Sequence, residues 1–226
     1  MTTPNRILIF DTETSGLIPK HTVPLDAQPY VLQLAFVVYD ADINRIIKSI
    51  DLMIRVPEHV IIQPLITEIT GITREICDTQ GVPIETALRE FYEEYMRCDL
   101  IVAHNIEFDQ EMMRIEIMRN TGLENSGLEN SGCPFIKSLF ALDNNSKPTY
   151  CTMTKGRGIC NIIRTAASGR TWVKPPRLEE LYEKLFDKKP RNLHNALVDT
   201  YVCLRCFVKM RFDRDLTMDQ SEIIMV

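Results

Sequence analysis

The chain has 226 residues, of which 45% are apolar and 25% charged, which is ordinary for a soluble protein of one domain. Its formal net charge of −5 does not by itself indicate a nucleic-acid-binding protein. No apolar run approaches the roughly 20 residues needed to cross a bilayer, and the N-terminus lacks the apolar core of a signal peptide. We therefore expect an intracellular protein with no membrane partner.

The stretch 6–17 predicts a buried strand that carries two acids one residue apart, Asp11 and Glu13. Side chains alternate along a strand, so both acids share a face with Ile7 and Ile9. Both faces are apolar before the acids, which indicates a central strand covered on both sides. Two carboxylates stay ionised there only if they are compensated, most simply by a divalent metal ion. From this stretch alone, two solvated acids in a turn are equally consistent.

Further elements follow from hydrophobic periodicity. Two β-rich runs joined by a hairpin loop predict an antiparallel meander with the first strand. Helices are predicted where apolar residues recur at helical spacing, and strands where short apolar runs stand between breakers. The predicted strands are 31–39, 46–56, 100–103 and 149–154, and the predicted helices are 83–97, 134–142, 178–186 and 195–210.

Two more acids stand at informative places. Asp109 follows the buried strand 100–103 and opens a helix, where an acid can favour the helix dipole. That position is also where α/β sheets present their chemistry. Asp199 shares an apolar stripe of the last helix with Cys203 and Cys206, and no cation lies within a turn of it. A carboxylate in that setting requires compensation, which favours metal ligation.

The seven cysteines are an odd number in apolar surroundings, which is typical of reduced core thiols. Cys203 and Cys206 have the spacing of zinc ligands, but no second such pair completes four ligands. We therefore expect no structural zinc.

Residues 121–132 contain a five-residue duplication rich in Gly, Asn and Ser, which predicts a tolerated surface insertion. We expect one domain over 1–212 with this insertion at about 121–133. Residues 213–226 are expected to form a frayed tail or an interaction segment.

A basic segment follows the insertion. Between Asn144 and Leu178 there is no acid, and two aromatic residues, Tyr150 and Trp172, stand among the cations. The cations are Lys147, Lys155, Arg157, Arg164, Arg170, Lys174 and Arg177. A basic segment with aromatic residues is typical of a surface that meets a polyanion, whereas a solvated loop is the simpler interpretation of a charge run alone.

The four acids occur in motifs that resemble those of the DEDDh, or DnaQ-like, 3′–5′ exonucleases of the ribonuclease H-like superfamily. The motifs are Asp11-Thr-Glu-Thr-Ser-Gly-Leu17, Ala103-His-Asn-Ile-Glu-Phe-Asp109 and His194-Asn-Ala-Leu-Val-Asp199, with Ile69-Thr-Gly-Ile-Thr73 as a further signature. The resemblance covers roughly 6–210. It implies an α/β fold with a five-stranded mixed sheet, in the strand order 3-2-1-4-5, flanked by helices.

The resemblance also implies a mechanism with two Mg²⁺ or Mn²⁺ ions, hard cations that prefer oxygen ligands. Asp11 would bridge the two ions, Glu13 and Asp199 would hold one of them, and Asp109 would support the other. His194 would be the general base, since an imidazole accepts a proton near neutral pH. The catalytic residues implied are therefore Asp11, Glu13, Asp109, His194 and Asp199.

By the same analogy, five residues of the first two motifs would contact the terminal nucleotide: Thr12, Thr14, Leu17, Asn105 and Phe108. Thr12 and Thr14 would lie near the 3′-hydroxyl, and Leu17 would wedge against the terminal base. Arg170 and Lys174 of the basic segment are hypothesised to guide the phosphate backbone.

The expected reaction releases nucleoside 5′-monophosphates from single-stranded or frayed 3′ ends. DNA is favoured over RNA, and an exoribonuclease remains the alternative, because no motif indicates how a 2′-hydroxyl is treated. A non-catalytic module that binds nucleic acid or a polymerase is less consistent with four acids. A haloacid dehalogenase-like phosphotransferase fits Asp11 but requires Asp at the position of Glu13. Partners in replication, repair or proofreading are possible for the exonuclease.

Overall fold

The computed structural model describes residues 5–121 and 147–216. Its main element is a five-stranded sheet in the order β3-β2-β1-β4-β5. The strands are β1 (Arg6–Thr14), β2 (Val31–Asp40), β3 (Arg45–Met53), β4 (Leu100–Ala103) and β5 (Thr149–Cys151). β1 pairs antiparallel with β2 and parallel with β4. The predicted ribonuclease H-like sheet and its strand order are therefore confirmed.

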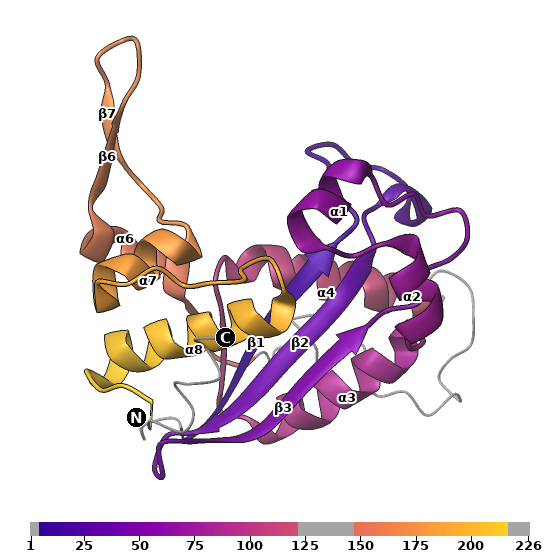
Figure 1. Ribbon diagram of the computed structural model, residues 1–226, viewed down its shortest axis with the longest axis horizontal. Coiled ribbons are helices and arrows are strands. Elements are labelled where there is room, and N and C mark those ends of the chain that lie inside the picture. The colour runs from indigo at the N-terminus through magenta and orange to yellow at the C-terminus, as the bar shows by residue number, and fades with distance from the viewer. Residues whose placement is uncertain (1–4, 122–146, 217–226) are drawn as a thin grey trace.

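Helices pack against both faces of this sheet (Figure 1). The described helices are η1 (Leu25–Ala27), α1 (Pro64–Thr70), α2 (Arg74–Gln80), α3 (Ile84–Arg97), α4 (Ile106–Thr121), α6 (Thr152–Cys160), α7 (Leu178–Phe186) and α8 (Ala196–Phe212). A separate hairpin of β6 (Ile162–Thr165) and β7 (Thr171–Lys174) stands between α6 and α7 in the chain. Of the described helices, none is long and apolar enough to cross a membrane.

The two faces of β1 meet different helices, as the alternation of its side chains predicts. Leu8 and Phe10 are buried in the core that α3 and α4 cover, whereas Ile7 and Ile9 are buried in the core that α7 and α8 cover. β1 is thus the central strand with helices on both sides. Its carboxyl end is reached from both layers, which lets helices of opposite faces contribute to one site there.

Several segments differ from the sequence-based prediction: β3 ends at Met53 rather than at Val56, and the sequence analysis did not assign α6, β6 or β7. β5 ends at Cys151 rather than at Thr154, because α6 begins at Thr152 and the Cys151 Sγ accepts a hydrogen bond from the Thr154 N–H at 3.5 Å. The signature at 69–73 forms the turn between α1 and α2, two helices that the sequence analysis did not assign. Gly71 ends α1 in the left-handed region, at φ 74°, and the Thr73 hydroxyl caps α2.

The described part of the chain ends beyond α8. Asp215 pairs with Arg205 at 2.7 Å, and Leu216 is buried in the core that α8 covers. These first residues of the predicted tail, 213–226, therefore pack against the domain. The predicted insertion, with its duplicated sequence, and the predicted helix at 134–142 lie outside the described residues, apart from Thr121 at the end of α4.

A buried carboxylate on α3 joins that helix to the sheet. Glu94, only 2% exposed, accepts hydrogen bonds from Arg6 of β1 at 2.6 Å and from Lys48 of β3 at 3.1 Å. Burial opposes ionisation of Glu94, but the bonds from Arg6 and Lys48 outweigh it and lower the pKa. The ionised form of Glu94 is therefore part of the contact between α3 and the sheet.

Replacing Glu94 by Gln is expected to lower the free energy of unfolding at pH 7 by about 2 kcal/mol, because the charge-assisted bonds from Arg6, Lys48 and the neighbouring Arg97 are lost. Urea unfolding measures the change. Glu90→Gln is the matched control, since Glu90 contacts the same Lys48 at 3.6 Å from a partly exposed position. This substitution is expected to cost less than about 0.5 kcal/mol. Equal effects of the two substitutions would contradict this account.

Candidate active site

Three carboxylates converge at the carboxyl end of β1. Asp11 and Glu13 extend from one face of the strand, and Asp199 comes from the first turn of α8, which packs on that face. One oxygen of each carboxylate lies within 4.8 Å of the corresponding oxygens of the other two. All three side chains keep part of their surface exposed. The chain thus brings acids that are 188 positions apart (199 − 11) into one cluster.

Polar contacts at the start of α8 position Asp199. The Asn195 side chain caps the helix by accepting from the backbone N–H groups of Leu197 and Val198, both at 3.2 Å. The buried Gln33 of β2 accepts a hydrogen bond from the Ala196 N–H at 3.1 Å. These contacts hold the first turn of α8 against the sheet, and Asp199 lies on that turn.

Asp109 reaches the same place from the opposite layer. It lies in the first turn of α4 and is 3% exposed. Its Oδ1 accepts hydrogen bonds from the Thr12 N–H at 3.1 Å and from the Thr12 hydroxyl at 2.8 Å. Thr12 stands between Asp11 and Glu13 on β1, so these bonds fix Asp109 beside the other three acids.

Burial raises the pKa of each of the four acids, and the like charge of neighbouring acids adds to the shift for Asp11, Glu13 and Asp109. Burial, followed by the charges of Asp109, Asp199 and Glu13, raises the pKa of Asp11 well above its usual range. Burial and the charge of Asp199 raise the pKa of Glu13 to about 8. Burial likewise raises the pKa values of Asp109 and Asp199 to about 7, although hydrogen bonds from Thr12 and from the His194 N–H oppose the shifts.

This donor set fits divalent cations. The buried Oδ1 of Asp199 accepts no hydrogen bond from the described residues, and an unsatisfied buried oxygen in a cluster of like charges is costly. Hard cations such as Mg²⁺ and Mn²⁺ bind through carboxylate oxygens. The residues that would hold such ions are Asp11, Glu13 and Asp199, with Asp109 adjacent.

The raised pKa values predict that the metal-free protein loses stability as pH rises. Below about pH 4 the acids are protonated in both the folded and the unfolded chain. Between their ordinary pKa values, 3.8 for Asp and 4.5 for Glu, and the folded values of about 7 to 8, the unfolded chain releases protons that the folded chain retains. The free energy of unfolding contributed by the cluster therefore falls over this window.

Thermal melts in EDTA between pH 5 and pH 8.5 measure this effect, and the wild-type protein is expected to melt at lower temperature at the higher pH. Mg²⁺ is expected to raise the melting temperature more at pH 8 than at pH 5.5, because protons compete for its ligands. A Mg²⁺ effect that is independent of pH would contradict the raised pKa values.

His194 lies at the entrance to α8 in an unusual conformation. Its φ is 69°, in the left-handed region, and its backbone N–H donates to the Asp199 Oδ2 at 3.2 Å. Its side chain is exposed. The backbone of His194 is thus tied to the acid cluster while the imidazole is open to a substrate.

The residues expected to contact the terminal nucleotide occupy two kinds of position. Leu17 is 84% exposed beyond the end of β1, and Asn105 is exposed at φ 72° before α4. Phe108 packs partly against the core. Thr12 and Thr14 are buried, and their hydroxyls donate to Asp109 and to the Gly16 carbonyl. In the structure, therefore, the two threonine side chains position other groups, whereas the side chains of Leu17 and Asn105 are accessible to a substrate.

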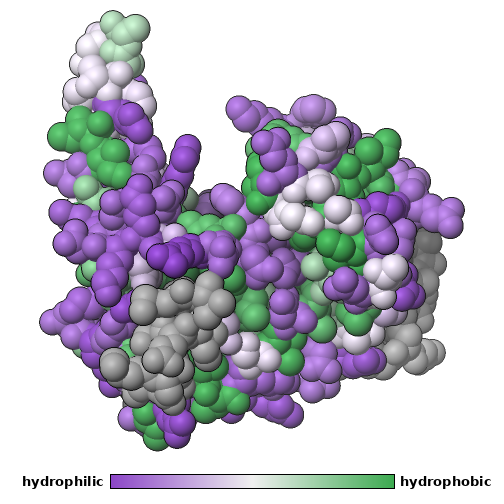
Figure 2. Space-filling view, viewed as in Figure 1, coloured by the Kyte–Doolittle hydropathy of each residue, from purple (hydrophilic) through white to green (hydrophobic). Residues whose placement is uncertain are grey.

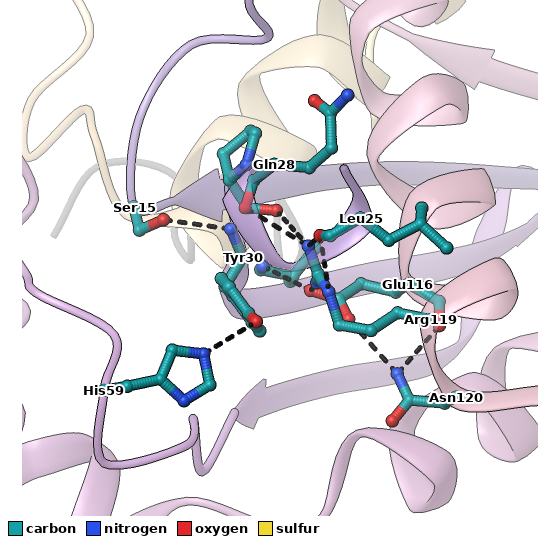
Figure 3. Close-up of polar contacts among 10 residues, drawn as sticks. Ser15, Leu25, Gln28, Tyr30, His59, Glu116, Arg119 and Asn120 are labelled. Atoms are coloured by element: carbon teal, nitrogen blue, oxygen red, sulfur yellow. Dashed lines mark hydrogen bonds and ion pairs between the residues drawn. The ribbon is translucent and has the colours of Figure 1, made fainter. Parts of the chain in front are cut away.

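A polar network holds the loop that follows β1 (Figure 3). The Arg119 guanidinium of α4 lies 3.6 Å from the centroid of the Tyr30 ring and pairs with Glu116 at 2.7 Å. It also donates to the carbonyls of Leu25, Gln28 and Pro29. Ser15 is joined to Tyr30 through both its backbone N–H and its hydroxyl. This network fixes both ends of the loop that carries Leu17.

His104 belongs to the second motif but has a structural role. Its Nε2 donates to the Pro176 carbonyl at 3.1 Å, and its Nδ1 therefore accepts from the Thr152 hydroxyl at 2.9 Å. Burial lowers the pKa of His104 to about 4, so the ring is neutral near pH 7. His104 thus joins the end of β4 to α6 and to the segment that precedes α7.

Sequence analysis missed two positioning residues. Gln33 is a buried polar residue within an otherwise apolar strand, and that contrast is the signal that identifies such residues. Thr12 was expected near the terminal nucleotide by analogy, but nothing in the sequence indicated that its hydroxyl also donates to Asp109. The partner of Thr12, Asp109, lies 97 positions away along the chain, and the partner of Gln33, Ala196, lies 163 positions away.

Among the basic residues, Arg170 is exposed next to the turn of the β6–β7 hairpin, whereas the Lys174 Nζ lies 2.7 Å from Glu180. The Lys174 charge is therefore compensated by a carboxylate at the base of the hairpin.

Six cysteines lie in the described residues, and all are free thiols. Cys203 and Cys206 are buried on α8.

The strand order and the carboxylates at the end of β1 define a ribonuclease H-like domain. Residues 8–207 match the model of the RNase_T exonuclease family, described as "Exonuclease". The chain therefore belongs to this exonuclease family, which confirms the family indicated by its motifs. A search of curated protein sequences found no match.

Solved structures of exonuclease I have a similar fold. The E. coli protein in complex with a dA16 oligonucleotide has a TM-score of 0.64 and 18% identity, over 93% of this chain and 42% of its own. Exonuclease I from Methylocaldum szegediense has a TM-score of 0.61 and 19% identity, over 93% and 41%. The zinc-bound complex of E. coli exonuclease I with single-stranded DNA has a TM-score of 0.62 and 21% identity, over 93% and 42%. This chain thus spans less than half the length of these neighbours.

Proposed function

We propose that the chain is a metal-dependent 3′–5′ exonuclease that releases nucleoside 5′-monophosphates from single-stranded or frayed DNA ends. The observation that carries this proposal is the convergence of Asp11, Glu13 and Asp199 within 4.8 Å, with Asp109 buried beside them. Four clustered carboxylates whose pKa values are raised in the folded chain are costly to fold. A binding module does not need such a cluster, whereas phosphodiester hydrolysis needs carboxylates that can hold divalent ions.

In the proposed reaction, water attacks the terminal phosphorus, the bond from phosphorus to the 3′-oxygen of the preceding nucleotide breaks, and that oxygen takes up a proton. Asp11, Glu13, Asp109 and Asp199 would hold two Mg²⁺ or Mn²⁺ ions, which would supply Lewis-acid activation of the water and neutralise charge on the phosphate. His194, exposed beside Asp199, accepts the proton of the attacking water.

The positions of exposed groups support attack at a chain terminus. Leu17 and Asn105 follow β1 and β4, two neighbouring parallel strands, at the edge where the acids lie. The exposed Leu17 side chain is suited to contact the terminal base. The Asn105 side chain is suited to contact a sugar or a phosphate. The neighbouring structures described above as complexes with dA16 and single-stranded DNA support DNA as the substrate.

Digestion of single-stranded DNA and RNA oligomers, labelled at the 3′ or the 5′ end, tests this proposal with Mg²⁺, Mn²⁺ or EDTA. We expect 5′-labelled DNA to shorten stepwise, 3′-labelled DNA to release its label first as a mononucleotide, and EDTA to stop both reactions. Faster digestion of RNA would assign the alternative exoribonuclease activity. Internal cleavage, or no cleavage with either metal, would contradict the proposal.

A further inference from the structure

The β6–β7 hairpin, residues 162–174, projects from the body of the protein and is here called the arm. Figure 1 shows it rising from the side that carries α6 and α7, and Figure 2 shows a hollow between it and the part of the molecule that carries α1. Its turn is closed by hydrogen bonds from the Ala166 N–H to the Arg170 carbonyl at 2.8 Å and from the Gly169 N–H to the Ala166 carbonyl at 2.9 Å. An isolated two-stranded ribbon is marginally stable in water, so its base requires support.

Side chains of neighbouring elements supply that support. Arg157 of α6 donates to the Val173 carbonyl at 2.8 Å. Lys174 pairs with Glu180 of α7 at 2.7 Å. His104, five positions before Asp109, bonds to the Pro176 carbonyl two residues after β7. The base of the arm is therefore joined to the β4–α4 connection, which immediately precedes the helix that carries Asp109.

One face of the arm combines an indole with guanidinium groups. Arg164 pairs with Trp172 and Ile162 with Lys174 in the hairpin register, so these four side chains share a face. Trp172 is 44% exposed and Arg164 is exposed. Exposed Arg170 lies two residues before Trp172. No acid occurs among residues 147–178, so within this segment the charge is of one sign.

A large exposed aromatic residue between arginines on a projecting ribbon matches the chemistry of a single-stranded nucleic acid. Every base has a face that stacks on an indole, and every linkage carries a negative charge for a guanidinium. Because this recognition does not read the base, it suits an enzyme that shortens a strand of any sequence.

We propose that the arm binds the single strand upstream of the cleaved terminus, with a base stacked on Trp172 and phosphates paired with Arg164 and Arg170. This inference rests on the proposed function for the direction in which the strand runs. It identifies the substrate as a polymer whose body contacts the arm while its 3′ end occupies the acid cluster.

The chain contains one tryptophan, so fluorescence excited at a wavelength that tyrosine does not absorb reports on Trp172 alone. The experiment titrates wild-type protein, with Mg²⁺, with phosphorothioate single strands of increasing length that resist cleavage. We expect strands long enough to reach the arm to quench the fluorescence, and thymidine monophosphate to leave it unchanged. The double variant Arg164→Gln/Arg170→Gln is expected to bind these strands about tenfold more weakly and with a flatter dependence on salt. Ile163→Ala, on the opposite face of the arm and 62% exposed, is the matched control with wild-type affinity.

Absence of quenching at saturating oligonucleotide would overturn the inference, and so would quenching by an acidic peptide in place of nucleic acid. The digestion assay separates this outcome from failure of the proposed function. Digestion without quenching would support the exonuclease activity and contradict binding by the arm. Quenching without digestion would support binding of nucleic acid by the arm and contradict the exonuclease activity.

Discussion

Asp11→Asn is expected to reduce the rate of single-strand digestion by about 10³-fold or more, because it removes the central carboxylate of the cluster. The same substitution is expected to raise the melting temperature of the metal-free protein at pH 8. Asparagine keeps the shape of the side chain but removes a buried charge that Asp109, Asp199 and Glu13 oppose. Loss of activity together with a gain in stability is the signature of a functional cluster that is costly to fold.

Digestion of labelled oligomers and thermal melts in EDTA measure the two effects. Asp26→Asn is the control, because Asp26 is an exposed carboxylate on η1, and neither activity nor stability is expected to change with it. An Asp11→Asn protein that melts at lower temperature than wild type in EDTA at pH 8 would contradict the electrostatic account, and full activity would contradict the catalytic one.

His194→Asn is expected to reduce digestion by about 10²–10⁴-fold, the range typical of losing a general base. Asparagine is the appropriate replacement, because it tolerates the left-handed conformation that His194 adopts at φ 69°. The backbone bond to Asp199 is then retained. Since the imidazole is exposed, the melting temperature and the affinity for Mn²⁺ are expected to be unchanged.

His21→Asn is the control, because His21 is also exposed but lies in the loop after β1. Parallel measurements of rate, melting temperature and Mn²⁺ affinity separate the possible roles. A His194→Asn protein that digests DNA at the wild-type rate would show that another group accepts the proton. A loss of Mn²⁺ affinity equal to the loss of rate would instead assign His194 to the metal site.

Each acid of the cluster stands at a place that the sequence marks out, but each signal alone is weak, and the resemblance to the DEDDh motifs is what implied their convergence. Asp11 and Glu13 end an apolar strand, Asp109 follows a second one, and Asp199 interrupts the apolar stripe of a helix. The alternation of side chains along β1 also predicts which pair of acids faces α8. The ends of parallel strands meet at one edge of a sheet, so order along the chain gives proximity in space.

The β6–β7 hairpin was not predictable in the same way. Its two strands have four residues each and leave Trp172 exposed, so they lack the alternation that half-buried strands show. The positioning roles of Gln33 and Thr12 were missed for another reason. Each depends on a hydrogen bond to one partner remote in sequence, and composition or spacing carries no signal for such a pair.

Calorimetric titration of Mn²⁺ into the wild-type protein and Asp11→Asn at pH 8 tests the central claim most directly, because it measures the metal site without substrate. We expect saturable uptake of two ions by the wild-type chain, with release of protons from the carboxylates, and a strongly reduced affinity in Asp11→Asn. A wild-type protein that takes up no Mn²⁺, or an Asp11→Asn protein that binds it equally well, would contradict the claim that these acids form a metal centre.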